Sequence, residues 1–101
     1  MKFYVYILQS TTSCRFYIGQ TQDLKSRIER HNRGYEKSTK NRGPWKLIYS
    51  TEFQTRSEAV ILEHKLKNFK SRSRIIKWIE SRGKDLNNIY EGRGSRKTKN
   101  L

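Results

Sequence analysis

The sequence predicts a small α+β domain in which helices flank a three-stranded antiparallel sheet, in the order β-β-α-β-α-α. First, three segments are rich in the aromatic and β-branched residues typical of strands: 3–9, 15–19 and 45–53. Second, apolar residues recur at helical spacing in three other segments: 23–32, 56–68 and 71–82. Third, a length of 101 residues suits one domain and excludes a two-domain dinucleotide enzyme or a large barrel.

The first predicted strand is apolar on both of its faces. One face carries Phe3, Val5 and Ile7, and the other carries Tyr4, Tyr6 and Leu8. Such a strand lies between two covering layers, so we expect 3–9 at the centre of the sheet. The connection over residues 10–14 is short, which favours an antiparallel hairpin with 15–19.

Each predicted helix has its own start signal. Asp23 stands where a cap or first-turn acid belongs, and Thr55 with Glu58 forms a capping box. Ser71 or Ser73 caps the third helix. The helical pattern ends near residue 82. We therefore assign the folded domain to residues 1–82 and expect a basic, flexible tail at 83–101.

The chain is strongly basic, with 23 Lys and Arg against nine Asp and Glu, a net charge of +14 and a mean hydropathy of −1.02. This charge attracts polyanions, so nucleic acid is the first partner to consider and an anionic membrane surface the second. Disordered chains share this composition, but they are poor in aromatic residues, and this chain has six Tyr, four Phe and two Trp.

Other features exclude several classes of protein. The single cysteine, Cys14, cannot form an intrachain disulfide, which favours a reducing, cytoplasmic location. Cys14, His31 and His64 are too few, at these spacings, for a structural zinc site. The apolar run at the N-terminus ends at Gln9, short of a signal peptide, and no segment approaches the ~18 apolar residues of a membrane span.

Three polar residues interrupt the apolar helix faces. Arg27 and His31 fall beside the stripe of the first helix, and Glu63 falls among the apolar positions of the second. A lone buried charge is costly, so these side chains either pair with each other at the core edge or line a wet cleft. Spacing alone leaves both interpretations open.

Two tyrosines of the predicted hairpin, Tyr6 and Tyr17, can stand on the same face as these polar residues. If all five side chains converge on that face, the set suits phosphodiester hydrolysis. A carboxylate can hold Mg²⁺, an arginine can stabilise developing phosphate charge, and a Tyr or His can take a proton from water. The structural alternative is that the tyrosines serve only in packing.

At these positions the sequence resembles a GIY-YIG nuclease of the small stand-alone branch. The two halves of the family name fall on Tyr4-Val5-Tyr6 and Tyr17-Ile18-Gly19. Residues 17–32 resemble the family's strand–turn–helix segment, and residues 56–63 resemble its later motif. The similarity covers about residues 2–80.

The resemblance implies a metal-dependent DNA endonuclease. Tyr17 would be the general base or position the attacking water, and Tyr6 would orient the water or the scissile phosphate. Arg27 would stabilise the transition state, and His31 would assist by hydrogen bonding or proton transfer. Glu63 would bind one Mg²⁺ or Mn²⁺ per active site, with no small-molecule cofactor.

The sequence departs from the family pattern at two points. Tyr4 stands in place of Gly in the first motif, so we assign it no catalytic role. The family's late Asn has no clear equivalent, because Asn68 follows Glu63 too closely and Ile75 and Ile76 lie where it is expected. In place of the DNA-recognition module of larger relatives, we expect basic side chains to contact nucleic acid: Lys25, Arg33, Lys37, Lys40, Arg42, Lys67, Arg72 and Arg74.

Two alternatives to a nuclease remain at this point. A non-catalytic nucleic-acid-binding module with the same fold explains the charge equally well, and an anionic-membrane protein would use the amphipathic segment 71–82. For a nuclease we expect branched, nicked or single-stranded DNA as substrate. The sequence leaves open the pathway, including repair and recombination, the oligomeric state and any targeting protein partner.

Overall fold

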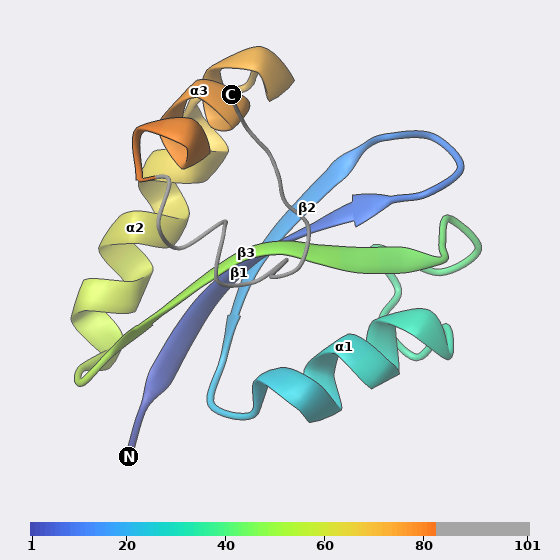
Figure 1. The fold of residues 1–101 in the computed structure, drawn as a ribbon. Coiled ribbons are helices and arrows are strands. Elements are labelled where there is room, and N and C mark those ends of the chain that lie inside the picture. The colour runs from blue at the N-terminus through green and yellow to red at the C-terminus, as the bar shows by residue number, and fades with distance from the viewer. Residues whose placement is uncertain (83–101) are drawn as a thin grey trace.

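The computed structural model describes residues 1–82, so the predicted tail at 83–101 lies outside the described residues. The fold class and element order are as predicted (Figure 1). The elements are β1 (Phe3–Ser10), β2 (Phe16–Thr21), α1 (Leu24–Asn32), β3 (Trp45–Phe53), α2 (Arg56–Asn68) and α3 (Arg72–Ser81).

The sheet is antiparallel throughout, in the order β2-β1-β3. The central position of β1 confirms the prediction from its two apolar faces. In the β1–β2 pairing, Tyr6 lies opposite Gly19 and Leu8 lies opposite Tyr17. Because β2 pairs only with β1, it is an edge strand, and side chains from either face of the sheet can approach this edge.

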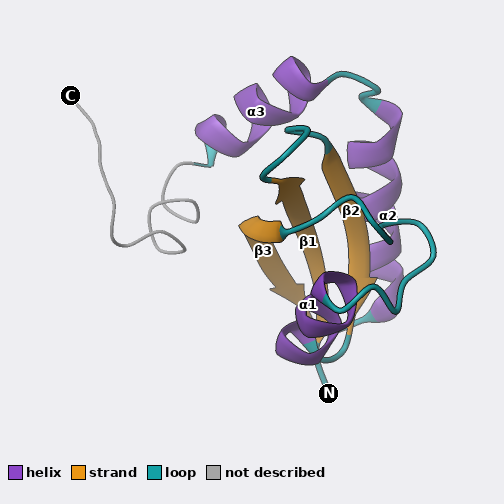
Figure 2. Ribbon diagram, turned by 90° about the vertical axis from the view of Figure 1, so that its right-hand side faces the viewer, coloured by secondary structure: helices purple, strands orange, loops and turns teal. Residues whose placement is uncertain are grey.

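Helices cover both faces of this sheet. Figures 1 and 2 show α1 on one side and α2 with α3 on the other. The α1 side packs Tyr6, Leu8 and Trp45 against Leu24 and Ile28. The other side packs a larger cluster around α2 and α3: Val5, Ile7, Ile18, Ile48, Tyr49, Ala59, Leu66, Ile75 and Ile79.

The helix caps follow the sequence signals. The side chains of Asp23, Thr55 and Ser71 each accept a hydrogen bond from a backbone N–H in the first turn of α1, α2 and α3, respectively. The alternative cap, Ser73, instead lies within α3, and its hydroxyl is 3.1 Å from that of Ser71.

The predicted boundaries of the second strand were wrong. The strand was expected to end at Gly19, but β2 continues to Thr21. Glycine commonly ends a strand, but here it lies inside one because the ring of Tyr6 occupies the space where a side chain would stand.

The apolar face of α3 is directed into the protein core. Ile75 and Ile79 on this face are buried, so the feature that suggested a membrane-binding helix serves in packing. Within residues 1–82, none of the helices combines the length and apolarity needed to cross a bilayer.

Candidate active site

The centre of the candidate site is Tyr6, which is fully buried on the α1 side of the sheet. Its hydroxyl lies 2.9 Å from Nε2 of His31 in the last turn of α1. The β1–β2 register places Gly19 opposite Tyr6. A Cβ added at Gly19 would lie 2.6 Å from the Tyr6 hydroxyl oxygen and 3.0 Å from Cε2 of Tyr17. Gly19 therefore leaves room for both rings.

We expect the substitution Gly19→Ala to displace the Tyr6 ring and to destabilise the fold by about 1–3 kcal/mol, as overpacking does. Urea denaturation measures this loss. Removing the nearest atom by Tyr6→Phe should make the double variant lose less than the sum of the two single changes. Strict additivity would show that Tyr6 and Gly19 do not constrain each other.

His31 is 2% exposed, and both of its ring nitrogens have a partner. Nδ1 lies 2.7 Å from the hydroxyl of Thr39, which itself donates to the backbone carbonyl of Glu36 at 3.4 Å. Thr39 thus accepts the Nδ1–H, and Nε2 accepts the proton of the Tyr6 hydroxyl. The result is a buried chain of hydrogen bonds from Tyr6 on β1, through His31 on α1, to Thr39 in the loop between α1 and β3.

Burial sets the protonation of both rings. Burial is the largest cause that lowers the pKa of His31; Glu36 opposes this shift, and Arg27 and Arg30 add to it. Burial also raises the pKa of Tyr6 far above its ordinary value, while Arg27 acts in the opposite direction. Near pH 7 His31 is therefore neutral and Tyr6 keeps its proton, in agreement with the direction of their hydrogen bond.

The lowered pKa of His31 predicts a pH dependence of stability. Its contribution to the free energy of unfolding is fully present above its unfolded pKa of about 6.5, and is lost as pH falls through the lower folded pKa. Protonated His31 can no longer accept the hydrogen bond from Tyr6. Urea denaturation at pH values from 7.5 to 5 should show this loss in the parent protein and not in His31→Gln. A parent protein that gains stability over this range would contradict the assignment.

Tyr17 is the partly exposed member of the aromatic group. Its ring centroid lies 4.7 Å from that of His31 and 6.2 Å from that of Tyr6. The edge-on ring of Trp45, which is part of the core, lies beyond it at 6.5 Å. Among residues 1–82 the Tyr17 hydroxyl makes no hydrogen bond, so it is available to a water or a substrate.

Arg27 completes this side of the site. Its Nε lies 3.7 Å from Oε2 of Glu36, and the Nε of Arg30 lies 2.8 Å from the same oxygen. The hydrogen bond from Arg30 is the largest cause that lowers the pKa of Glu36, so this carboxylate is ionised near neutral pH. Arg27 is thereby held at the protein surface with part of its charge compensated.

Glu63 lies on α2, on the other side of the sheet. Its Oε1 accepts a hydrogen bond of 2.8 Å from the Gln20 side chain of β2, and its Oε2 lies 2.8 Å from Nζ of Lys67. Burial acts to raise the pKa of Glu63, but the contacts with Lys67 and Gln20 outweigh it and lower the pKa. Glu63 is therefore an ionised, largely buried carboxylate attached to the edge strand.

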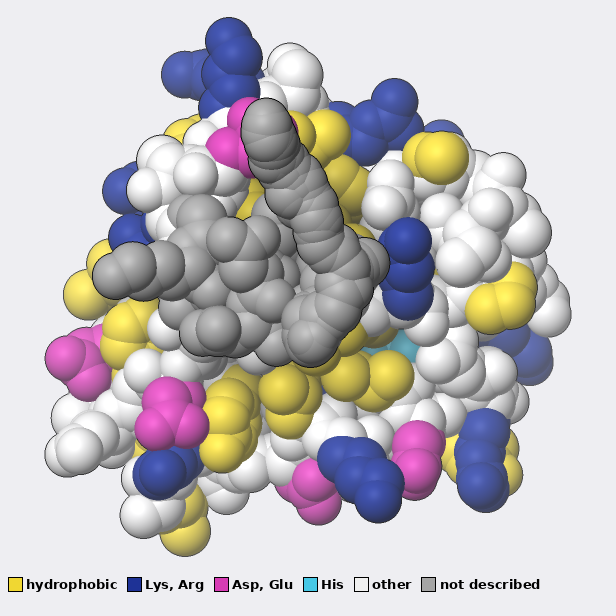
Figure 3. Space-filling view, viewed as in Figure 1, with side chains coloured by type: hydrophobic (Ala, Val, Ile, Leu, Met, Phe, Trp, Pro, Cys, Tyr) yellow, Lys and Arg dark blue, Asp and Glu magenta, His cyan; other side chains and the backbone are white. Residues whose placement is uncertain are grey.

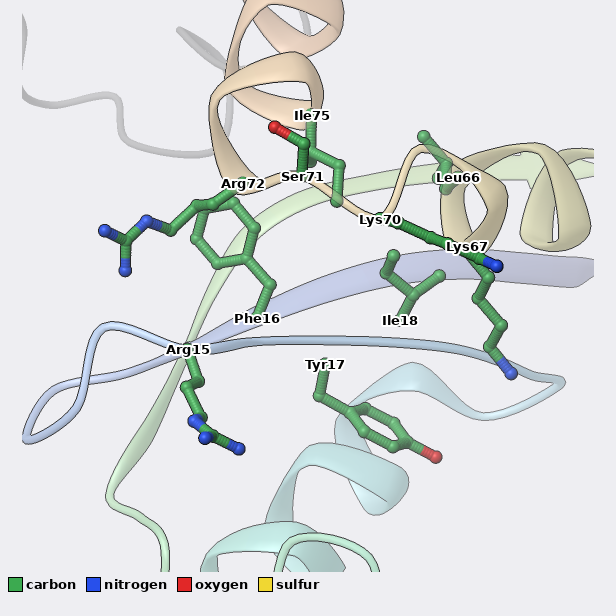
Figure 4. A pocket seen from close by; sticks show the side chains of 10 residues that line it. All are labelled: Arg15, Phe16, Tyr17, Ile18, Leu66, Lys67, Lys70, Ser71, Arg72 and Ile75. Atoms are coloured by element: carbon green, nitrogen blue, oxygen red, sulfur yellow. The ribbon is translucent and has the colours of Figure 1, made fainter.

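The hypothesis that all five side chains converge on one face is therefore corrected. Tyr6, Tyr17, Arg27 and His31 lie on the α1 side, but Glu63 contacts β2 from the α2 side. Gln20 follows Gly19 in β2, so the Gln20 side chain is directed to the opposite face of the sheet from the Tyr6 ring that lies against Gly19. Figure 4 shows the same alternation, with Tyr17 directed away from Phe16 and Ile18. The predicted alternative of an Arg27–Glu63 pair is also wrong, since Arg27 pairs with Glu36.

The side chains predicted to contact nucleic acid are all exposed. Two of them already have a protein contact, because Arg72 donates to the carbonyl of Cys14 at 3.0 Å and Lys67 pairs with Glu63. Figure 3 shows Lys and Arg side chains spread over one face, with Asp and Glu side chains among them. The exposed set is Lys25, Arg33, Lys37, Lys40, Arg42, Lys67, Arg72 and Arg74.

The carboxylate of Glu63 is the candidate ligand for a divalent metal ion. In the described part of the chain, no three His, Cys, Asp or Glu side chains lie close enough to enclose an ion. Mg²⁺, however, is commonly held by one or two carboxylates, with waters and substrate phosphates as its other ligands. An ionised carboxylate at a strand edge fits that donor set. A metal there would share or replace the contact with Lys67.

Sequence reasoning missed three residues that hold the site together: Gln20, Glu36 and Thr39. Alternation along β2 would have placed Gln20 on the face of Ile18, and hence near α2. Glu36 is the one acidic residue in the basic loop 33–44, and its negative charge could have pointed to a partner among the neighbouring arginines. For Thr39 there was no signal, because its contact depends on the path of an irregular loop.

Comparisons with known proteins give one consistent family. The model of a family described as "GIY-YIG catalytic domain" matches residues 2–77. A UPF0213 protein of Pediococcus pentosaceus is 38% identical over 88 residues, covering 86% of this chain and 90% of its own. A UPF0213 protein of Staphylococcus haemolyticus is 40% identical over 82 residues, covering 80% and 98%. The solution NMR structure of a UPF0213 protein from Bacillus halodurans aligns with a TM-score of 0.58 at 30% identity, covering 94% and 100%.

Proposed function

Because the chain belongs to the GIY-YIG catalytic domain family, a family of endonucleases, we propose that it is a metal-dependent DNA endonuclease with its active site at the edge strand β2. The observation that carries the proposal is the hydroxyl of Tyr17, which makes no hydrogen bond within residues 1–82. It stands beside a buried network of Tyr6 and His31, which holds the surrounding groups but leaves Tyr17 exposed to a substrate.

Tyr17 is proposed to position the attacking water and to accept its proton. Its ring packs against His31 and Trp45, so the hydroxyl is held in one place relative to the strand edge. A neutral tyrosine is a weak base, since its unperturbed pKa is about 10. Positioning the water is therefore the larger part of the role that we propose for Tyr17.

Tyr6 has a different part in this proposal from the one that the resemblance implied. A fully buried hydroxyl that donates to His31 does not touch a phosphate. Tyr6 and His31 are instead positioning residues that fix the ring of Tyr17 and the end of α1. Arg27, which is partly exposed, stabilises the charge that develops on the scissile phosphate.

Glu63 would hold one Mg²⁺ or Mn²⁺ together with water and a substrate phosphate. When bound, such an ion polarises the phosphate and supplies a water of lowered pKa. Gln20 keeps the carboxylate against β2, and Lys67 neutralises it in the absence of metal. The proposed products carry 5′-phosphate and 3′-hydroxyl ends, and the proposed substrates are branched or single-stranded DNA.

One observation favours a second candidate, a non-catalytic nucleic-acid-binding module. Both carboxylate oxygens of Glu63 have protein partners, Gln20 and Lys67, and an ion must compete with the lysine. A pure binding module would retain this ion pair when DNA is bound. Its basic surface would explain DNA affinity without any metal.

Incubation of the purified protein with labelled single-stranded, duplex and branched DNA separates the two candidates. For the nuclease we expect binding in EDTA and strand cleavage after addition of Mg²⁺ or Mn²⁺, with the rate ranking the three substrates. The binding module predicts the same affinity with and without metal, and intact strands in every reaction.

A further inference from the structure

A pocket of about 490 Å³ runs along the exposed edge of β2 (Figure 4). Its other walls are the end of α2, the α2–α3 connection and the first turn of α3. This volume lies within the range of pockets that take small organic groups, about 300–1,000 Å³. Tyr17 and Lys67, which belong to the candidate active site or contact it, are among the lining residues of the pocket. The proposed reaction places no ligand in the pocket itself.

The inner wall of the pocket is apolar. Phe16 and Ile18 contribute from β2, Leu66 from α2 and Ile75 from α3. Ile18, Leu66 and Ile75 belong to the buried core, and the ring of Phe16 packs against that core while remaining partly exposed. The pocket therefore offers an apolar surface that includes one aromatic ring.

The outer wall of the pocket is cationic. Arg15, Lys67, Lys70 and Arg72 line it, and no Asp or Glu does. Within the described residues, neither the Arg15 nor the Lys70 side chain has a hydrogen bond or an ion pair. Arg15 and Lys70, two charges without an acidic partner in this part of the chain, lie beside the apolar wall and suit a ligand that carries both an anion and an apolar ring.

The backbone at Lys70 points to a role for that side chain. Lys70 has a φ of 51°, in the left-handed region that glycine ordinarily occupies at the end of a helix. A lysine in this conformation costs folding energy that a glycine does not. Lys70 lines the pocket together with Lys67 (Figure 4), so the strained position adds a charge to the rim.

The pocket also lies where the two halves of the candidate active site meet. Tyr17 of β2 is among its lining residues, with its ring directed toward the α1 side (Figure 4), and Lys67, the ion-pair partner of Glu63, lines it from the α2 side. A ligand that fills the pocket therefore lies next to both halves. This position suits the nucleotide that adjoins the bond being cleaved.

We propose that the pocket is a subsite for one unpaired nucleotide next to the cleaved phosphodiester, with its base against Phe16 and its phosphate at Lys70 and Arg15. The proposal rests on the proposed nuclease function for the place of the cleaved bond. A nucleotide combines the flat apolar group and the anion that the two walls require. A paired base presents neither face to Phe16, so the base must stand outside a duplex.

The first test measures binding in EDTA, where no cleavage occurs, by fluorescence anisotropy of a labelled single-stranded oligonucleotide. Lys70→Gly removes the charge and suits the left-handed backbone, so the variant should fold at least as well as the parent protein. We expect the slope of log Kd against log salt to fall by about 0.7, the value for one lost phosphate contact on a single strand. Lys65→Gln is the matched control, because it removes one exposed charge of α2 outside the pocket.

The second test addresses the base. Phe16→Leu keeps an apolar side chain in the core but removes the aromatic face, and we expect about tenfold weaker binding. A single abasic nucleotide is then moved along the oligonucleotide. At one position it should weaken binding to the parent protein about tenfold and should have no further effect on Phe16→Leu.

The outcomes separate the subsite from the nuclease proposal. If Lys70→Gly and Phe16→Leu bind as Lys65→Gln does, or if no abasic position is coupled to Phe16, the subsite is refuted whether or not the protein cleaves DNA. If both variants bind the oligonucleotide more weakly and one abasic position is coupled to Phe16, the subsite is supported. Intact DNA in Mg²⁺ would then refute the nuclease function alone.

Discussion

Tyr17→Phe is expected to lower the single-turnover rate of DNA cleavage by about 10²-fold or more, the usual contribution of a positioned acid or base. The substitution removes only the hydroxyl, which has no hydrogen bond in residues 1–82. Phenylalanine keeps the ring that packs against His31 and Trp45. Quenched-flow measurement with enzyme in excess isolates this step, and anisotropy in EDTA should give the parent affinity.

Tyr6→Phe is the matched comparison for this result. It also removes one hydroxyl, but a buried one that donates to His31, so stability should fall along with the rate. A Tyr17→Phe enzyme with the parent rate would remove Tyr17 from the reaction. Equal rate losses with equal destabilisation in both variants would reduce the role of Tyr17 to packing.

Glu63→Gln should abolish metal-dependent cleavage, with a loss of at least about a hundredfold at every Mg²⁺ concentration, because a bound ion supplies several kcal/mol of transition-state stabilisation. The amide has nearly the same shape but no charge to hold the ion. Binding in EDTA should remain or strengthen, since one negative charge at a basic surface is removed. Cleavage rates over a Mg²⁺ titration and anisotropy in EDTA measure the two effects.

Glu52→Gln is the control for the general effect of losing a carboxylate. Glu52 pairs with Lys2 on an exposed part of the sheet, and neither residue lines the β2 pocket. Its rate should match that of the parent protein. Full cleavage by Glu63→Gln at ordinary Mg²⁺ concentrations would exclude Glu63 as the metal ligand.

Local patterns in the sequence were enough to predict the order of the elements. The two apolar faces of β1 predicted its central position, and Thr55 with Glu58 predicted the start of α2. The error at β2 arose because Gly19 has two opposite uses. It can end a strand, or it can leave space for a large ring on the neighbouring strand, and only the register with Tyr6 distinguishes them.

For the candidate site, the sequence could predict only which side chains share a face of one hairpin or of one helix. Alternation placed Tyr6 and Tyr17 together, and helical spacing placed Arg27 beside His31. The face contacted by Glu63 depends on how α2 packs across the sheet, which no local pattern contains. The pattern that places Tyr6 between two layers does not show which group its hydroxyl contacts, so the hydrogen bond to His31 was not predicted.

The most direct test of the account is cleavage of 5′-labelled single-stranded and branched DNA by the parent protein and by the double variant Tyr17→Phe/Glu63→Gln, purified identically. We expect the parent protein to cleave in Mg²⁺ or Mn²⁺, to leave 5′-phosphate ends and to be inactive in EDTA. The double variant should bind the same DNA without cutting it. Equal cleavage by both proteins, or none by the parent protein on any substrate, would contradict a hydrolytic site at the edge of β2.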